Sequence, residues 1–280
     1  MKKGIVLAVV LLLSLTGCAN FMDTPDAEEY PTLAPRGAIY KDLINLPRPK
    51  GKIMVSVYDF RDQTGQYKAY PASTFATSVP QGGTSMLTSS LLDSQWFMPL
   101  EREGLQNLLT ERKIIRAAQQ KNDAPANIGA ELPSLKSANL VIEGGIIGYD
   151  SDIKTGGHGA GYFGLAAYGE YRMDQVTVNL RAVDVRTGQI LLSVTTSKTI
   201  FSHALSGSVF RYIAYQDLLE MESGYTNNEP VNIAVMSAID SAVIHMIIEG
   251  IQKGMWAPAD AKQMESPIIQ RYLEETTTIL

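Results

Sequence analysis

Cysteine is almost absent from this 280-residue chain: Cys18 is the only one, so the chain can form no internal disulfide. This cysteine follows a basic start, Lys2 and Lys3, and an apolar run from Gly4 to Leu15. The run is too short for a mature membrane helix, and small residues precede the cysteine, as in a secretory signal peptide. The pattern predicts a signal peptide over residues 1–17 and a lipoprotein that begins with an acylated Cys18.

Positive charge is also scarce. The chain carries 24 lysine and arginine residues against 29 aspartate and glutamate residues, a formal charge of −5. Cleavage before Cys18 would remove Lys2 and Lys3 and leave 22 basic residues, which lowers the formal charge to −7. Such a chain lacks the excess of basic residues that binds a phosphate backbone, and we therefore exclude nucleic acid as a partner.

The residues around Cys18 indicate the membrane to which the protein is attached. Two or three acyl chains on one cysteine are enough for stable attachment. Ala19 and Asn20 occupy the positions where an aspartate would favour retention in the inner membrane. We therefore expect a lipoprotein of the outer membrane, anchored on its periplasmic side.

Signatures of catalysis and of metal or cofactor binding are missing too. His158, His203 and His245 are far apart in the sequence, and no nucleophile elbow of the G-x-S-x-G type occurs. Residues 159–164 match G-x-G-x-x-G, but a dinucleotide site needs a helix after these glycines, and alternating, strand-like sequence follows instead. We expect no catalytic residue, no metal site, no cofactor and no enzymatic activity.

No apolar run after Cys18 approaches the roughly 20 residues that span a membrane as a helix, so a membrane-spanning part would have to consist of strands. The chain does contain alternating strand-like and helix-like segments, which predict an α/β core with helices packed on a sheet. A proline-rich stretch before this core indicates an extended tether, and the residues after the core indicate a polar tail that is loose at its end. The expected strands cover residues 53–60, 96–100, 139–147, 176–185 and 190–195, and the expected helices cover 84–92 (with Thr84 as its cap), 101–121 and 231–253.

Two stretches, residues 149–175 and 196–225, do not fit this core. Polar and apolar residues alternate in them as in membrane-barrel strands, but a soluble β-hairpin alternates equally well, and periodicity does not decide between the two. Two hairpins cannot close a barrel alone, so the membrane interpretation requires a homo-oligomer. After Met173 the alternation changes phase, which we interpret as a bulge. The predicted lumen-facing charges are Asp150, Asp152, Lys154, Glu170, Arg172 and Asp174.

A long segment, residues 66–80, connects the first expected strand with the first expected helix. It is too long for a plain turn, and loops of this length are usually functional or disordered. Tyr67, Tyr70 and Phe75, together with two prolines, argue against disorder. The aromatic side chains either fill a small satellite core or are presented to a passing chain or ligand.

Several long and specific segments are distributed over the whole core. They include Val55-Ser56-Val57-Tyr58, Tyr70-Pro71-Ala72-Ser73, Pro99-Leu100-Glu101-Arg102, the run from Glu111 to Gln119, Val178-Asn179-Leu180-Arg181 and Asn228-Glu229-Pro230-Val231. Taken together, these segments resemble the CsgG family of curli secretion channel lipoproteins over about residues 36–256.

The resemblance implies a pore that exports unfolded, amyloid-forming curli subunits through the outer membrane without a nucleotide. The implied fold is an α+β or α/β periplasmic domain whose two amphipathic β-hairpins join an oligomeric transmembrane β-barrel, built from nine copies in the family. The implied partners are the curli subunits as cargo, a periplasmic accessory factor that caps the vestibule, an extracellular curli assembly factor and outer-membrane lipid. The family's constriction triad of Tyr, Asn and Phe corresponds to Tyr70, Thr74 and Phe75, so threonine replaces the Asn layer here.

The alternative is a soluble periplasmic lipoprotein that binds peptides or partner proteins, with both hairpins in water. Extraction by detergent as large rings would distinguish a pore from this binding module. The pore interpretation divides the chain into a signal peptide (1–17), a lipidated tether (18–50), a periplasmic α/β domain (51–148) with the constriction loop (66–80), a first transmembrane hairpin (149–175), periplasmic strands (176–195), a second transmembrane hairpin (196–225), a periplasmic C-terminal helix (226–258) and a polar tail (259–280).

Overall fold

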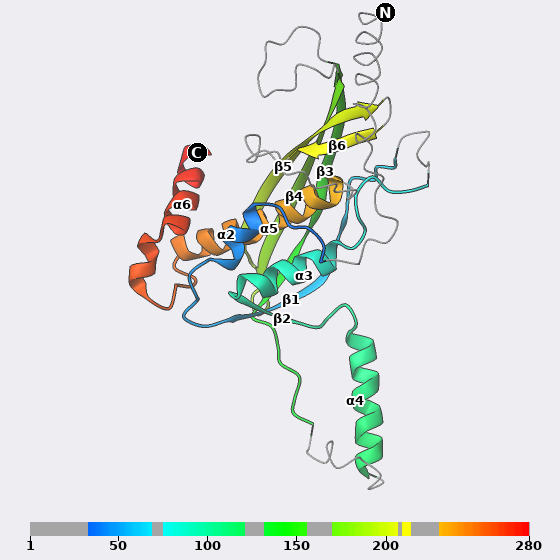
Figure 1. Ribbon diagram of the computed structural model, residues 1–280. Helices are drawn as coiled ribbons and strands as arrows, with labels where there is room; N and C mark the ends of the chain where they lie inside the picture. The colour runs from blue at the N-terminus through cyan, green and yellow to red at the C-terminus, as the bar shows by residue number, and fades with distance from the viewer. Residues whose placement is uncertain are drawn as a thin grey trace, which may run out of the picture. The chain divides into compact units, whose positions relative to one another are not determined.

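The computed structural model describes residues 33–68, 75–120, 132–155, 170–206, 209–213 and 230–279. The chain divides into two units, Met1–Pro35 and Arg36–Leu280, and the second unit is built around one sheet with the strand order β2-β1-β3-β4-β5-β6 (Figure 1). The strands are β1 (Ile53–Asp62), β2 (Phe97–Leu100), β3 (Leu140–Thr155), β4 (Glu170–Asp184), β5 (Ile190–Ser206) and β6 (Val209–Ile213). The helices are α2 (Ile39–Ile44), α3 (Gly83–Ser94), α4 (Leu105–Gln120), α5 (Pro230–Gln252), the 3-10 helix η3 (Ala261–Glu265) and α6 (Pro267–Ile279).

The sheet changes from parallel to antiparallel pairing at β3. β1 is parallel to both β2 and β3, because α3 and α4 carry the chain back between these strands. β3 to β6 follow as antiparallel neighbours. In the turn between β4 and β5, Gly188 has a φ of 70°, and the Asp184 carboxylate accepts hydrogen bonds from the amides of Arg186 (2.7 Å) and Thr187 (2.9 Å). The predicted strands are confirmed, although β3, β4 and β5 continue past their predicted limits.

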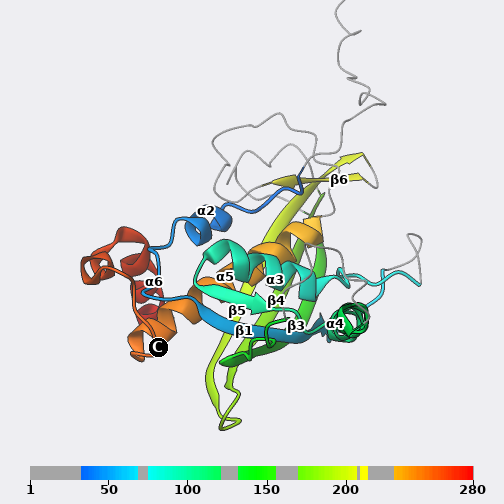
Figure 2. The same ribbon diagram turned by 90° about the horizontal axis from the view of Figure 1, so that it is seen from below.

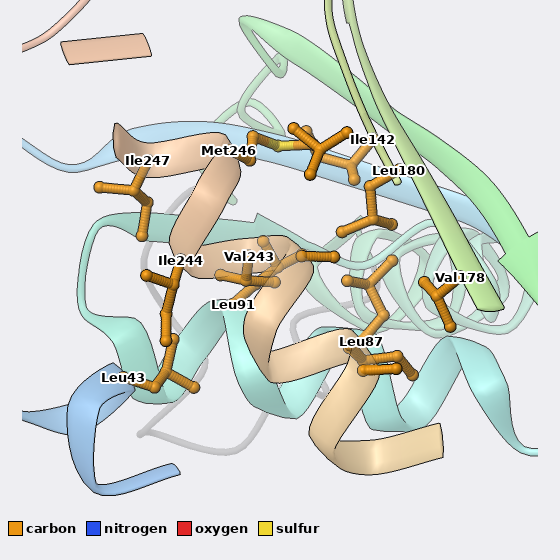
Figure 3. Packing of buried hydrophobic residues seen from close by; sticks show 14 of the residues in the cluster. Leu43, Leu87, Leu91, Ile142, Val178, Leu180, Val243, Ile244, Met246 and Ile247 are labelled. Atoms are coloured by element: carbon orange, nitrogen blue, oxygen red, sulfur yellow. The ribbon is translucent and has the colours of Figure 1, made fainter. Parts of the chain in front are cut away.

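The long helix α5 is the centre of the hydrophobic core. It packs with α3 on one face of the sheet (Figure 2), and Val243 and Ile244 lie among side chains from the sheet and the neighbouring helices (Figure 3). α5 is long and apolar enough to cross a membrane, the one such helix in the described part of the chain. Because 78% of its apolar window is buried by the rest of the chain, α5 is a core helix. The expectation that no run after Cys18 reaches this length is therefore wrong.

Helix α4 confirms the predicted helix but stands apart from this core (Figure 1). No side chain from Leu105 to Gln119 is fully buried, and Ile114 is 56% exposed. Part of the helix is covered by the segment that follows it, since Arg112 donates a hydrogen bond to the carbonyl oxygen of Pro133. α4 thus has an amphipathic face that the described chain covers only in part.

Two segments expected to lie outside the core, a tether and a polar tail, are part of the folded unit. α2 packs on the core through Leu43, which is fully buried, and α6 packs through Ile269. The carboxylate of Asp42 joins the two helices, because it accepts a hydrogen bond from the Tyr272 hydroxyl (2.9 Å) and pairs with Arg271. The expectation of a tether up to residue 50 is therefore wrong, and the polar tail from residue 259, expected to be loose at its end, forms η3 and α6 up to Ile279. A few apolar side chains in otherwise polar stretches dock both segments.

Replacing Leu43 with alanine tests whether residues 36–50 belong to the core. Leu43→Ala should lower the free energy of unfolding by about 2–5 kcal/mol, because it removes a fully buried leucine. Ile44→Ala is the matched control on the same helix, and since Ile44 is 45% exposed we expect a loss below about 1 kcal/mol. Urea unfolding followed by circular dichroism measures both variants. Small and equal effects of the two substitutions would indicate that these residues belong to the tether and not to the core.

Candidate functional site

The segment between β1 and α3 forms a narrow loop whose two arms run antiparallel. The Lys68 amide donates a hydrogen bond to the carbonyl oxygen of Ala76 (2.8 Å), and the Ser78 amide donates to that of Gln66 (2.9 Å). An antiparallel bridge lies between these two hydrogen bonds. The arms therefore form a short ladder, and residues 69–74, which connect them, lie outside the described part of the chain.

Both ends of this loop are fixed to the core. At the β1 end, the amide of Gln63 donates a hydrogen bond to the carbonyl oxygen of Ile146 in β3 (2.9 Å). At the α3 end, Val79 is buried, and a Cβ atom at Gly83 would stand 2.7 Å from the carbonyl oxygen of Phe60. Any other residue at position 83 would have to move α3 or β1, so glycine keeps the two elements in close contact.

Thr84 has a different role from the helix cap that the sequence predicts. α3 begins at Gly83, and the backbone at Gly82 caps it without a side-chain hydrogen bond. The hydroxyl of Thr84 instead accepts a hydrogen bond from the amide of Phe60 in β1 (3.0 Å). Thr84 therefore ties the first turn of α3 to the strand on the other side of the loop.

Phe75 is the one predicted constriction residue that the structure describes. It lies beside the ladder and is 92% exposed, and Tyr67 on the opposite arm is 62% exposed. A phenylalanine that is this exposed forgoes most of the free energy that burial would contribute. Neither aromatic side chain fills a satellite core, which favours the interpretation that the loop presents them. Tyr70 and Thr74 lie outside the described residues, as does the predicted lipidation site Cys18.

The pairing of β3 with β4 overturns the predicted set of lumen-facing charges. Asp150 pairs with Gln175, and Ser151 pairs with Asp174. Directly paired residues lie on the same face of a sheet and consecutive residues on opposite faces, so Asp150 and Asp174 lie on opposite faces. Asp150 is exposed, whereas Asp174 is only 1% exposed. The prediction requires all six charges to lie on one face of the sheet, and this pairing shows that they do not.

Asp174 continues the buried side of β4. It alternates in phase with Val176 and Val178, which are fully buried. The Tyr149 hydroxyl donates a hydrogen bond to the Asp174 carboxylate (2.8 Å) and offsets part of the cost of burying it. Over residues 170–177 the described β4 pairs without a register shift, so the bulge predicted after Met173 is wrong.

Side chains of the other four predicted charges lie outside the described residues, but their backbone pairings are defined. Both antiparallel pairs, β3 with β4 and β5 with β6, extend beyond the part of the sheet that α3 and α5 cover (Figure 1). Two of the four positions are in β3 and two in β4. Asp152 pairs with Met173, Lys154 with Tyr171, Arg172 with Ile153 and Glu170 with Thr155.

A polar cluster holds α3 against α5. The guanidinium group of Arg36 donates hydrogen bonds to Ser89 (2.8 Å) and Asp93 (3.0 Å) on α3, and to Asp240 on α5 (3.4 Å). Asp240 is fully buried and also accepts a hydrogen bond from the Ser90 hydroxyl. Burial raises the pKa of the Asp240 carboxyl to about 6, although the hydrogen bond from Ser90 and the charge of Arg36 oppose the increase. This cluster fixes the helix that follows the loop.

No group of three or more histidine, cysteine, aspartate or glutamate side chains that could hold an ion occurs within the ranges described above. His245, on α5, packs edge-on against the Tyr272 ring with 5.2 Å between ring centroids, and its Nε2 atom is 3.8 Å from a Glu275 carboxylate oxygen. Burial lowers the pKa of His245, which favours the neutral imidazole of an interior residue.

These features define a class of protein: a mixed α/β domain with a six-stranded sheet that presents an aromatic loop between its first strand and the helix that follows. The chain belongs to the CsgG family, described as "Curli production assembly/transport component CsgG", whose family model matches residues 36–276. The family resemblance found in the sequence is thereby confirmed.

Relatives in this family match the chain over nearly its full length. The curli production assembly/transport component CsgG of Salmonella typhimurium (strain LT2) is 53% identical over 274 residues, which cover 98% of each chain. The Escherichia coli (strain K12) protein of the same description is 52% identical over 272 residues, which cover 97% of each. Two solved structures are distantly similar: the PelC dodecamer from Paraburkholderia phytofirmans (14% identity, TM-score 0.29, 70% of this chain and 88% of that chain) and the hypothetical protein CT253 from Chlamydia trachomatis (13%, 0.35, 71% and 97%).

The pKa of Asp240 predicts how the polar cluster depends on pH. The pKa of the Asp240 carboxyl is about 6 in the folded state and 3.8 ordinarily, so the folded chain binds the Asp240 proton more tightly than the unfolded chain does. The protonated carboxyl therefore stabilises the fold at low pH, and this stabilisation is lost as pH rises from the ordinary pKa through the folded-state pKa. Relative to Asp240→Asn, the wild type should therefore lose up to about 3 kcal/mol of unfolding free energy between pH 4 and pH 7. Urea unfolding at a series of pH values measures this difference.

Asp184→Asn is the control with the opposite sign. Hydrogen bonds from the Thr187 and Arg186 amides lower the pKa of Asp184, so its stabilisation is lost as pH falls. A difference between wild type and Asp240→Asn that does not change with pH would contradict the raised pKa of Asp240.

Proposed function

We propose that this chain is an outer-membrane lipoprotein that assembles with copies of itself into a channel for unfolded curli subunits. Membership in a family of curli production assembly and transport components supports the proposal, as do relatives at 52–53% identity over nearly the whole chain. The observation that carries it is Phe75, which is 92% exposed beside a ladder that keeps the loop narrow.

The aromatic loop would form the constriction of this channel. A closed ring of copies would place one Phe75 side chain per copy around a common axis, and Tyr70 and Thr74 would add a second aromatic layer and a hydroxyl layer. Aromatic rings contact an extended chain through almost any side chain, so the ring would accept cargo of varied sequence. A folded domain is wider than an extended chain and would be held back sterically.

The strands that extend from the sheet would supply the wall of the channel. β3, β4 and β5 contain 16, 15 and 17 residues. A strand crosses a membrane with about 9–11 residues, so each of these strands is long enough to pair in the domain at one end and in a membrane at the other. Acyl chains on Cys18 would hold the assembly to the membrane, and the family implies nine copies per ring.

Transport through this channel would be passive and non-enzymatic. The periplasm supplies no nucleotide, so the driving force has to come from the cargo and its partners. A periplasmic accessory factor that caps the vestibule would confine the unfolded subunit and reduce its conformational entropy, which the subunit regains outside. An extracellular assembly factor would then remove the emerged subunit and make its exit irreversible.

Single-channel recording in planar bilayers tests the role of Phe75 in the full-length, lipidated protein. Phe75→Ala should raise the conductance, because removing one ring per copy widens the narrowest section. Tyr58→Ala is the matched control: Tyr58 is also an exposed aromatic residue, at 54%, but lies within β1 and away from the loop. We expect this control to conduct like the wild type.

An unchanged conductance in Phe75→Ala would place this residue away from the constriction. A wild-type protein that extracts from membranes as a small particle and never conducts would instead favour the peptide-binding lipoprotein without a pore.

A further inference from the structure

We propose that Asp62 is a positioning residue that clamps the two ends of the loop together. The inference rests on the proposed function, because the position of the loop affects transport only if Phe75 contributes to a constriction. Asp62 is the last residue of β1, and its backbone is held in the sheet by pairing with Ile146 of β3. Its carboxylate is therefore a fixed point against which both arms of the loop can be aligned.

One carboxylate oxygen of Asp62 fixes the arm that leaves β1. Asp62 Oδ1 accepts hydrogen bonds from the amide (2.8 Å) and from the hydroxyl (2.7 Å) of Thr64. Gly65 follows with a φ of 64°, in the left-handed region that glycine adopts without steric cost. The carboxylate and the glycine together turn the chain out of the sheet and towards the ladder.

The other oxygen reaches the arm that returns to α3. Asp62 Oδ2 accepts a hydrogen bond from the side-chain amide of Gln81 (3.3 Å), 19 residues further along the chain. The same nitrogen of Gln81 also donates to the carbonyl oxygen of Val79 (3.2 Å), which accepts a second hydrogen bond from the Thr77 hydroxyl (3.0 Å). Because Val79 is buried, Gln81 connects Asp62 to a segment that is anchored in the core.

This clamp requires a carboxylate. Asp62 accepts three hydrogen bonds from two arms through its two oxygens, whereas an asparagine has a single acceptor oxygen and cannot accept the hydrogen bonds of both arms. The same strand provides a second carboxylate, Asp59, which pairs with Arg61 (2.6 Å between charged atoms). Asp59→Asn therefore removes the same charge from β1 and leaves the described contacts of the clamp in place.

The scarcity of cysteine allows a direct test in the full chain. Cys18→Ala combined with Phe75→Cys leaves one thiol, which carries a nitroxide spin label beside the ladder. Adding Asp62→Asn should increase the mobility of the label and narrow its electron paramagnetic resonance lines, whereas adding Asp59→Asn should not.

Planar-bilayer recordings on the lipidated protein provide a second readout. Asp62→Asn should increase the current noise of the open channel severalfold, and Asp59→Asn should leave it unchanged. Gln81→Ala, at an exposed position outside β1, reports on the clamp if Asp62→Asn does not fold. The clamp is refuted if Asp62→Asn and Gln81→Ala both leave the spectrum of the spin label unchanged. It is also refuted if Asp59→Asn has the same effect as Asp62→Asn. A wild type that never conducts would contradict the channel, while the spectra would still decide on the clamp.

Discussion

The burial of α5 between the sheet, α3 and α2 is the interaction on which the rest of the structure depends. Ile239, Val243 and Ile247 are fully buried, and each such side chain contributes about 1.5–3 kcal/mol relative to exposure in water. β1 and α3 are both parts of this core, so the core itself fixes the two ends of the aromatic loop, independently of the contacts that the loop makes. A loop carried by a rigid scaffold can present a side chain at a defined place.

Several features that this core leaves exposed or extended lead us to infer that copies of the chain assemble. Phe75 on the loop and Ile114 on α4 are largely exposed, and neither packs into the core. The strands β3, β4 and β5 are each longer than a compact domain of this size needs. A ring of copies would give these features a common role, because it joins the strands into one wall and brings the loops to one axis.

Local periodicity predicted the elements whose signal lies within a few neighbouring residues, such as β1 and α5. The burial of Asp174 could not be predicted in this way, because it depends on the Tyr149 hydroxyl, 25 residues away. The docking of α2 and α6 depends on Asp42 and Tyr272, which are 230 residues apart. The aromatic loop was recognisable from its length and composition, but its attachment at Asp62 and Gln81 depends on where the fold brings two polar side chains.

Electron microscopy of the full-length, lipidated protein extracted in detergent tests the central claim most directly. The account predicts closed rings, with density from the loop that narrows the central opening at one level. The loop density should be visible without a label, because every copy in the ring contributes the same loop at the same level. Particles the size of a single chain, or rings whose opening has no narrow level, would contradict the account.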